Sequence, residues 1–152
     1  MRRLASTLLI LAAATFAALP AHAAEVEKTV PFAFDQWTAL DSTDGPVTLH
    51  RIRIIRQKGG FTKSAFLRPG NDEYLETVQI QLEYSNSGKD DWKAKLDIAW
   101  LDDHGTIIDG YNDADSLDDD ESHTNDTVTL STLKYGIAQA KKLHIKIRFD
   151  RE

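Results

Sequence analysis

The chain has 152 residues, no cysteine, and 24 acidic against 18 basic residues, a formal net charge of −6 at pH 7. This length suits one domain, and the absence of cysteine excludes disulfide scaffolds, thiol catalysis and cysteine-ligated metal sites. The acidic balance makes nucleic acid an unfavourable partner, because phosphates attract basic surfaces.

Residues 1–23 have the pattern of a secretory signal peptide. Two arginines precede an apolar run over 4–19, which ends at Pro20 before Ala21-His22-Ala23. Small residues at positions 21 and 23 suit signal peptidase. The run of 16 residues is shorter than the roughly 20 that span a bilayer. We therefore expect cleavage after Ala23, a single periplasmic or secreted domain over 24–152, and no stable membrane insertion after cleavage.

Alternation of apolar and polar residues is the main pattern in the rest of the chain, and it is typical of strands with one buried face. In chain order the predicted strands are Lys28–Phe34, Val47–Arg56, Phe61–Leu67, Val78–Tyr84, Ala94–Trp100, Thr106–Tyr111, Asp126–Leu130 and Leu143–Phe149. The pattern is clearest in the fourth, fifth and last of them.

Turn-forming residues separate these strands. Gly59-Gly60 and Pro69-Gly70-Asn71 predict chain reversals, and Asn86-Ser87-Gly88 predicts a hairpin loop. Asp102-Asp103-His104-Gly105 predicts a type I turn in which Gly105 adopts the left-handed conformation.

One short helix is expected before the last strand. Thr132 is the predicted N-cap, and Leu133, Ile137 and Ala140 share one apolar face. Eight short strands and one helical segment predict an all-β protein, an immunoglobulin-like or fibronectin-III-like sandwich of about seven or eight antiparallel strands. Trp100 is expected in its core.

The segment 78–108 resembles the FxLYD-type bacterial domain. A strand leads to Asn86-Ser87-Gly88, a second strand ends in Trp100-Leu101-Asp102, and Gly105 precedes a third strand. Trp100-Leu101-Asp102 stands where the family name expects Leu-Tyr-Asp, and the preceding Phe is absent. The resemblance covers 31 residues and implies an immunoglobulin-like fold in exported or membrane-tethered bacterial proteins, with no catalytic residues.

Charge is segregated along the chain, and residues 102–126 contain ten acidic residues but no lysine or arginine. The densest candidates for a Ca²⁺ site are Asp113, Asp115, Asp118, Asp119, Asp120 and Glu121. Calcium uses six to eight oxygen ligands, although the glycine of an EF-hand loop is missing. The simpler interpretation is a solvated loop that deters edge pairing. The alternatives are a Ca²⁺ site and a docking surface.

Residues 45–71 contain six basic residues and no acidic one. Arg51 and Arg53 lie on the solvated face of one predicted strand, and Arg56 follows them. This face is a candidate for binding phosphate or carboxylate groups of an envelope polymer or lipid. Cross-strand pairing with Glu83 or Asp97 is the simpler interpretation, and head-to-tail association through the two charge blocks is a further one.

The aromatic residues Trp37, Trp92, Tyr74 and Tyr111 lie in or near predicted loops. They are expected to cap the core, and the alternative is stacking on a sugar ring. His104 and His123 flank the acidic block and are weak zinc candidates. No G-x-S-x-G or S-x-x-K motif occurs, so a serine nucleophile has no support from the sequence.

These patterns predict a non-catalytic exported domain that binds or scaffolds an unknown envelope protein or polymer. The first alternative is a Ca²⁺- or carbohydrate-binding module that uses the acidic residues and Tyr111. The second is a small hydrolase. No cofactor is expected other than Ca²⁺ in the first alternative.

Overall fold

The computed structural model describes residues 25–57 and 74–151. The predicted signal peptide, the predicted strand Phe61–Leu67 and the turns at Gly59-Gly60 and Pro69-Gly70-Asn71 lie outside these residues. In the described part of the chain, no helix has the length and apolar character needed to cross a membrane.

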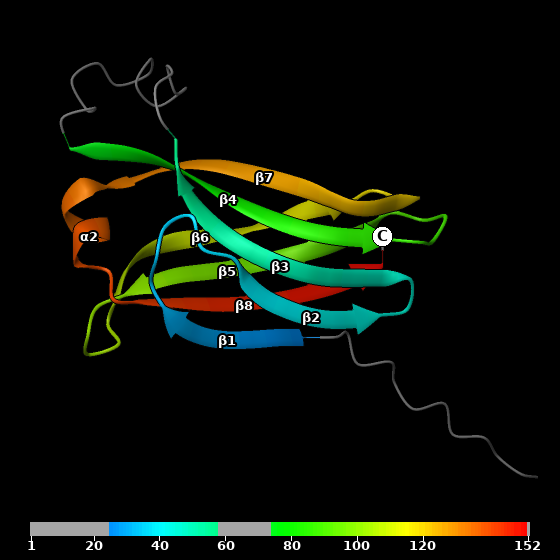
Figure 1. Ribbon diagram of the computed structural model, residues 1–152, viewed down its shortest axis with the longest axis horizontal. Coiled ribbons are helices and arrows are strands. Elements are labelled where there is room, and N and C mark those ends of the chain that lie inside the picture. The colour runs from blue at the N-terminus through cyan, green and yellow to red at the C-terminus, as the bar shows by residue number, and fades with distance from the viewer. Residues whose placement is uncertain (1–24, 58–73, 152) are drawn as a thin grey trace, which may run out of the picture.

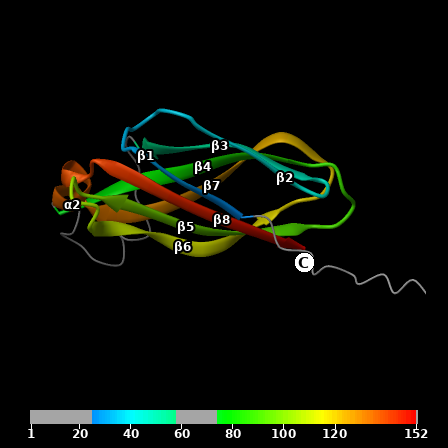
Figure 2. The same cartoon turned by 90° about the horizontal axis from the view of Figure 1, so that it is seen from below.

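Two antiparallel four-stranded sheets form the two layers of a sandwich (Figure 1). Sheet A has the order β1 (Glu25–Pro31), β8 (Lys142–Arg151), β5 (Trp92–Leu101) and β6 (Ile107–Leu117). Sheet B has the order β2 (Thr38–Asp44), β3 (Val47–Arg56), β4 (Leu75–Asn86) and β7 (Glu121–Leu133). Helix α2 (Lys134–Gln139) precedes β8 at one end of the molecule, and Figure 2 shows the two layers edge-on. The prediction of an all-β two-sheet sandwich is confirmed.

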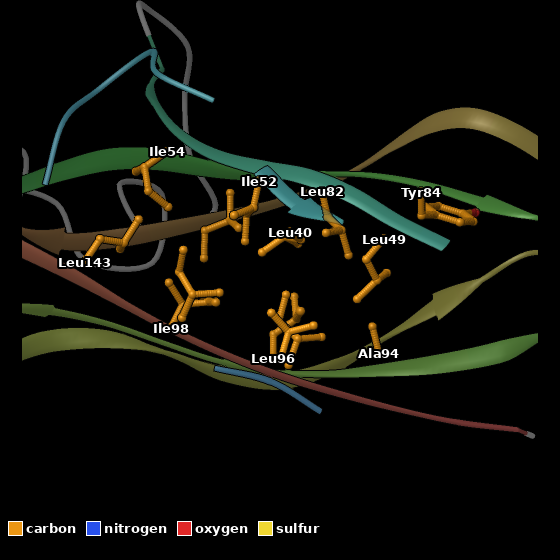
Figure 3. Close-up of a cluster of buried hydrophobic side chains, with 14 of the residues drawn as sticks. Leu40, Leu49, Ile52, Ile54, Leu82, Tyr84, Ala94, Leu96, Ile98 and Leu143 are labelled. Carbon is orange, nitrogen blue, oxygen red and sulfur yellow. The ribbon is translucent and has the colours of Figure 1, made fainter. Parts of the chain in front are cut away.

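The core lies between the sheets and consists of the alternating apolar residues that predicted the strands (Figure 3). On β5 the residues that belong to the core are Ala94, Leu96, Ile98 and Trp100, with Trp100 completely buried. On β8 the buried residues are Leu143, Ile145, Ile147 and Phe149. Period-two burial therefore explains why these two strands and β4 were predictable.

The link between β4 and β5 differs from the prediction. These strands belong to different sheets, so Asn86-Ser87-Gly88 is a crossing between layers and the predicted hairpin loop is wrong. Asn86 is completely buried, and its Nδ2 donates hydrogen bonds to the carbonyl oxygens of Asp90 (3.0 Å) and Leu117 (3.1 Å). Its Oδ1 accepts a bond from the Gly88 N–H (3.0 Å). A single buried amide thus stabilises the corner where the chain changes sheets.

The acidic block is not one loop, which corrects the simpler interpretation of the sequence. Strand β6 extends to Leu117 and β7 begins at Glu121, so only residues 118–120 form a turn. The two strands are edge strands of different sheets. Polar residues occupy both faces of β6, so its sequence does not alternate between apolar and polar residues. The predicted strands at 106–111 and 126–130 are therefore longer than expected.

Two further elements differ. Strand β2 was not predicted, because a break in its pairing with β3 between Ala39 and Ser42 interrupts its alternation. Thr132 is not a helix cap: it is a buried residue of β7 whose Oγ1 donates to Asp109 Oδ2 at 2.6 Å. Helix α2 has Leu133 at its N-cap without a side-chain bond. Ile137 and Ala140 are buried as expected, whereas Leu133 is exposed, so its predicted place on the apolar face is wrong. Gly105 has the predicted left-handed conformation, with φ of 86°.

Candidate functional site

Irregular pairing is concentrated at one level of sheet B. The register shifts in all three strand pairs of the sheet: at Ala39/Ser42 in β2, at Leu49/Arg51 in β3 and at Tyr84/Asn86 in β4. These shifts share a level, because Arg51 pairs with both Ala39 and Glu83, and Leu49 pairs with both Ser42 and Tyr84. Bulges redirect side chains and are frequent beside functional sites.

Two residues at this level have a left-handed backbone. Asp41 has φ of 49° and His123 has φ of 52°. For a residue other than glycine this conformation costs roughly 1–2 kcal/mol. Two residues with this unfavourable backbone conformation lie at the same level of sheet B. The contacts around them must therefore offset the free-energy cost and hold the backbone in this conformation.

A continuous set of polar contacts crosses the outer face of sheet B here, and we name its members the bulge cluster: His50, Arg51, Glu83, Ser85 and His123. His50 Nε2 lies 2.8 Å from Ser85 Oγ, and the His123 backbone N–H donates to the same oxygen at 2.9 Å. The two imidazole rings stack with centroids 4.1 Å apart. His123 Nδ1 lies 3.0 Å from Glu83 Oε1, and Arg51 Nε donates to Glu83 Oε2 at 2.7 Å.

Contacts within the bulge cluster shift the pKa values of Glu83 and His50. Glu83 is only 7% exposed, and its hydrogen bond with His123, together with Arg51, lowers the pKa of its carboxyl. Burial and the neighbouring His123 lower the pKa of His50, so its ring is neutral at pH 7. A neutral histidine at 2.8 Å from a serine hydroxyl has the spacing of a base and its nucleophile. Glu83, however, bonds His123 rather than His50, so the carboxylate does not orient the imidazole that contacts the serine.

Arg51 and Arg53 lie side by side on the outer face of β3, next to the cluster, and both contact an aromatic ring. Arg56 has the same parity along β3 as the buried Ile52 and Ile54, so the prediction that it shares the face of Arg51 and Arg53 is wrong. The segment before β2 runs along β3, with Phe34 bridged to Ile54. The guanidinium carbons of Arg51 and Arg53 lie 4.4 and 4.3 Å from the centre of the Trp37 ring. Arg56 lies 4.2 Å from the centre of the Phe34 ring.

Each of these arginines also has a partner on β4. Arg51 forms an ion pair with Glu83, which confirms one of the two predicted cross-strand pairs. Arg53 Nε donates to Gln81 Oε1 at 2.8 Å, and Arg56 pairs with Glu76 at 2.8 Å. The other predicted partner, Asp97, belongs to sheet A. The guanidinium groups are therefore held on two sides before any ligand arrives.

The residues proposed as Ca²⁺ ligands are distributed over three elements. Asp113 and Asp115 lie on β6, Asp118, Asp119 and Asp120 form the turn, and Glu121 begins β7. Asp113 and Asp115 pair with Leu96 and Ala94, so they share the inward side of sheet A. The structure instead brings Asp115 near Asp126, a residue outside the predicted set of ligands.

The other candidates are also placed. Tyr111 lies within β6 rather than in a loop, packs against the core, and has a pKa raised by burial to about 12. Trp92 begins β5 and its ring lies 6.4 Å from that of Phe149. His104 lies in the turn between β5 and β6, close to the half-buried Asp102 and the exposed Asp103. His123 belongs to the bulge cluster, so the two histidines occupy different sheets.

Asp115 is expected to make stability depend on pH. Burial, and next the charges of Asp126 and Asp113, raise its pKa to about 6 from 3.8. Because the pKa is higher in the folded state, protonation of the Asp115 carboxyl stabilises the fold. This contribution to the free energy of unfolding is complete below about pH 4 and is lost as the pH rises through 6. At pH 4 the free energy of unfolding of Asp115→Asn should equal that of the wild type. At pH 7.5 it should be higher than that of the wild type by about 1 kcal/mol, a value reduced for solvent screening.

Urea unfolding at a series of pH values measures this difference. Asp118→Asn removes a carboxylate from the exposed turn and should produce no comparable pH-dependent gain. Equal curves for the two variants would show that Asp115 is not the titrating group.

Comparison with known proteins adds no relative: neither a scan against protein-family models nor a search of curated proteins finds a match.

Proposed function

We propose that this chain is an exported, non-catalytic domain that binds a partner protein of the cell envelope through the outer face of sheet B. The face comprises the bulge cluster together with Trp37 and Arg53. The observation that carries the proposal is the fixed arrangement of Arg51 and Arg53 over Trp37, next to the bulges. The signal-peptide pattern at residues 1–23 supports export, and the resemblance to the FxLYD-type domain supports the same class of protein.

The chemistry of this face suits a protein partner. Tryptophan and arginine are the residues that most often dominate binding energy at interfaces. A guanidinium group has five N–H donors, and the bonds of Arg53 to Gln81 and of Arg51 to Glu83 use only some of them. Side chains already held in place lose less conformational entropy on binding. The free donors favour a partner segment that presents carboxylates.

The bonding of the cluster supports binding rather than hydrolysis. Ser85 Oγ already accepts the His123 N–H, and the only buried carboxylate of the cluster bonds to the other histidine. Hydrolysis of p-nitrophenyl esters by the purified protein tests this directly. We expect no turnover that Ser85→Ala abolishes, and such turnover would replace the binding proposal by a hydrolase.

Photo-crosslinking in the source cells tests the face itself. A benzophenone amino acid at Asn125, which is exposed and pairs with Glu83, should give one defined protein adduct. The same residue at Ser116, which is exposed on β6 of sheet A, is the matched control. Arg53→Gln should remove the adduct at Asn125. Adducts of equal yield at both positions, or an adduct that persists in Arg53→Gln, would contradict the proposed face. Mass spectrometry of the exported protein should find Ala24 at its N-terminus.

A further inference from the structure

A groove on the outer face of sheet A lies on the opposite layer from the proposed binding face. Its volume is about 320 Å³, within the range of small-molecule sites. Its polar lining residues are Lys95 and Asp97 of β5, Asn112 and Asp113 of β6, and Lys146 and Arg148 of β8. Asp113 pairs with the inward-facing Leu96, so the cations of the lining face the groove with one outward carboxylate, that of Asp97. The groove is hollow because long cationic side chains of β8 and β5 stand beside the short side chains of Asn112 and Ala114.

Strand register places two cations directly opposite each other in this groove. Arg148 pairs with Lys95, and the next outward-facing row pairs Lys146 with Asp97. Like charges at directly opposed positions destabilise a sheet. Neighbouring acids relieve this only in part: Lys95 bonds Asp150 at 2.6 Å, whereas the Arg148 guanidinium is 3.9 Å from Glu25. A bound anion would relieve the remaining repulsion.

The other end of the groove offers different chemistry. Asp97 is exposed, and Asn112 pairs with it across β5 and β6. Neither side chain has a hydrogen-bond or ion-pair partner within the described ranges 25–57 and 74–151. A carboxylate and an amide side by side accept and donate the hydrogen bonds that sugar hydroxyls need. The two rows are two residues apart along the strands, about 7 Å, which is comparable with the length of one hexuronic acid.

We propose that this groove binds a hydroxylated organic anion of the size of a single sugar acid. Its carboxylate lies between Arg148 and Lys95, where the planar guanidinium can form two parallel hydrogen bonds. Its hydroxyl groups bond Asp97 and Asn112, and Lys146 lies beside Asp97 in the same row. The site is independent of the partner-binding face on sheet B.

Amide chemical shifts of the purified protein, titrated with glucuronate, test the proposal. We expect saturable shifts at Lys95, Asp97, Asn112 and Arg148, with a dissociation constant in the millimolar range. Glucose lacks the carboxylate and acetate lacks the hydroxyl groups, so each should bind at least tenfold more weakly. Absence of saturable shifts with glucuronate would overturn the site, and equal binding of acetate would overturn the assignment to a sugar acid.

Variants separate a built site from a general attraction to cations. Lys95→Gln and Arg148→Gln should each weaken glucuronate binding at least tenfold, and Asp97→Asn should weaken it without changing the weak binding of acetate. Lys93→Gln makes the same charge change on the same strand, outside the groove lining, and should leave binding unchanged. Equal effects of Lys93→Gln and Lys95→Gln would show that only net charge matters and would contradict the proposal.

Discussion

Replacing Trp100 with alanine is expected to lower the free energy of unfolding by about 3–5 kcal/mol. The side chain is completely buried on the inward side of β5. Its ring lies 6.4 Å from that of Phe32, so it joins the segment after β1 to the core of sheet A. Its Nε1 has no hydrogen-bond partner within the described residues. The loss is therefore one of packing and apolar burial, because no hydrogen bond is removed.

Urea unfolding monitored by circular dichroism measures this loss. Trp100→Phe keeps an aromatic ring in the core and removes the unpaired N–H, so it should cost considerably less than the alanine variant. Trp92→Ala is the matched control, because this half-buried ring packs at the end of the core against Phe149. A loss below 1 kcal/mol for Trp100→Ala would contradict the inward orientation of this residue.

Asn86→Ala is expected to lower the free energy of unfolding by about 2–3 kcal/mol, because it leaves buried polar groups without partners. The side-chain amide connects the carbonyl oxygens of Asp90 and Leu117 to the Gly88 N–H. These groups belong to the start of the β5 connection and to the end of β6. Their loss should therefore loosen the corner at which the chain passes between the sheets.

Two variants distinguish the hydrogen bonds from the volume of the side chain. Asn86→Asp keeps the shape but replaces two donated hydrogen bonds by repulsion between oxygen atoms, so its loss should equal or exceed that of alanine at pH 7. Ser87→Ala removes an exposed hydroxyl bonded to the Pro46 carbonyl oxygen and should change the free energy by less than about 0.5 kcal/mol. A similar small effect of Asn86→Ala would show that the corner does not depend on this amide.

The predictability of each strand follows from how many of its faces are buried. Strands β4, β5 and β8 have one apolar face against the core, and their alternation was readable. Strand β3 was predicted with its correct bounds, Val47–Arg56, although a bulge at His50 changes which positions face inward. The edge strand β6 was predicted too short, because charged and polar residues occupy both of its faces.

The bulge cluster could not be predicted in the same way. His50 and Ser85 are 35 residues apart, and Ser85 and His123 are 38 apart. Their contact depends on three register shifts at one level of sheet B, and no local pattern encodes such a shift. Similarly, Asp115 was predicted in a loop and Asp126 at the start of a strand, and only the meeting of the edge strands β6 and β7 brings them together.

The sequence by itself determined the fold class, a two-layer β-sandwich with Trp100 in its core. The alternation of apolar and polar residues along a strand shows which side chains are buried on folding. Tertiary structure alone decided that β4 and β5 belong to different sheets, that Arg51 and Arg53 share the ring of Trp37, and that Lys95 faces Arg148. The physical reason is that burial is a property of one strand, whereas register and strand order depend on contacts between distant segments.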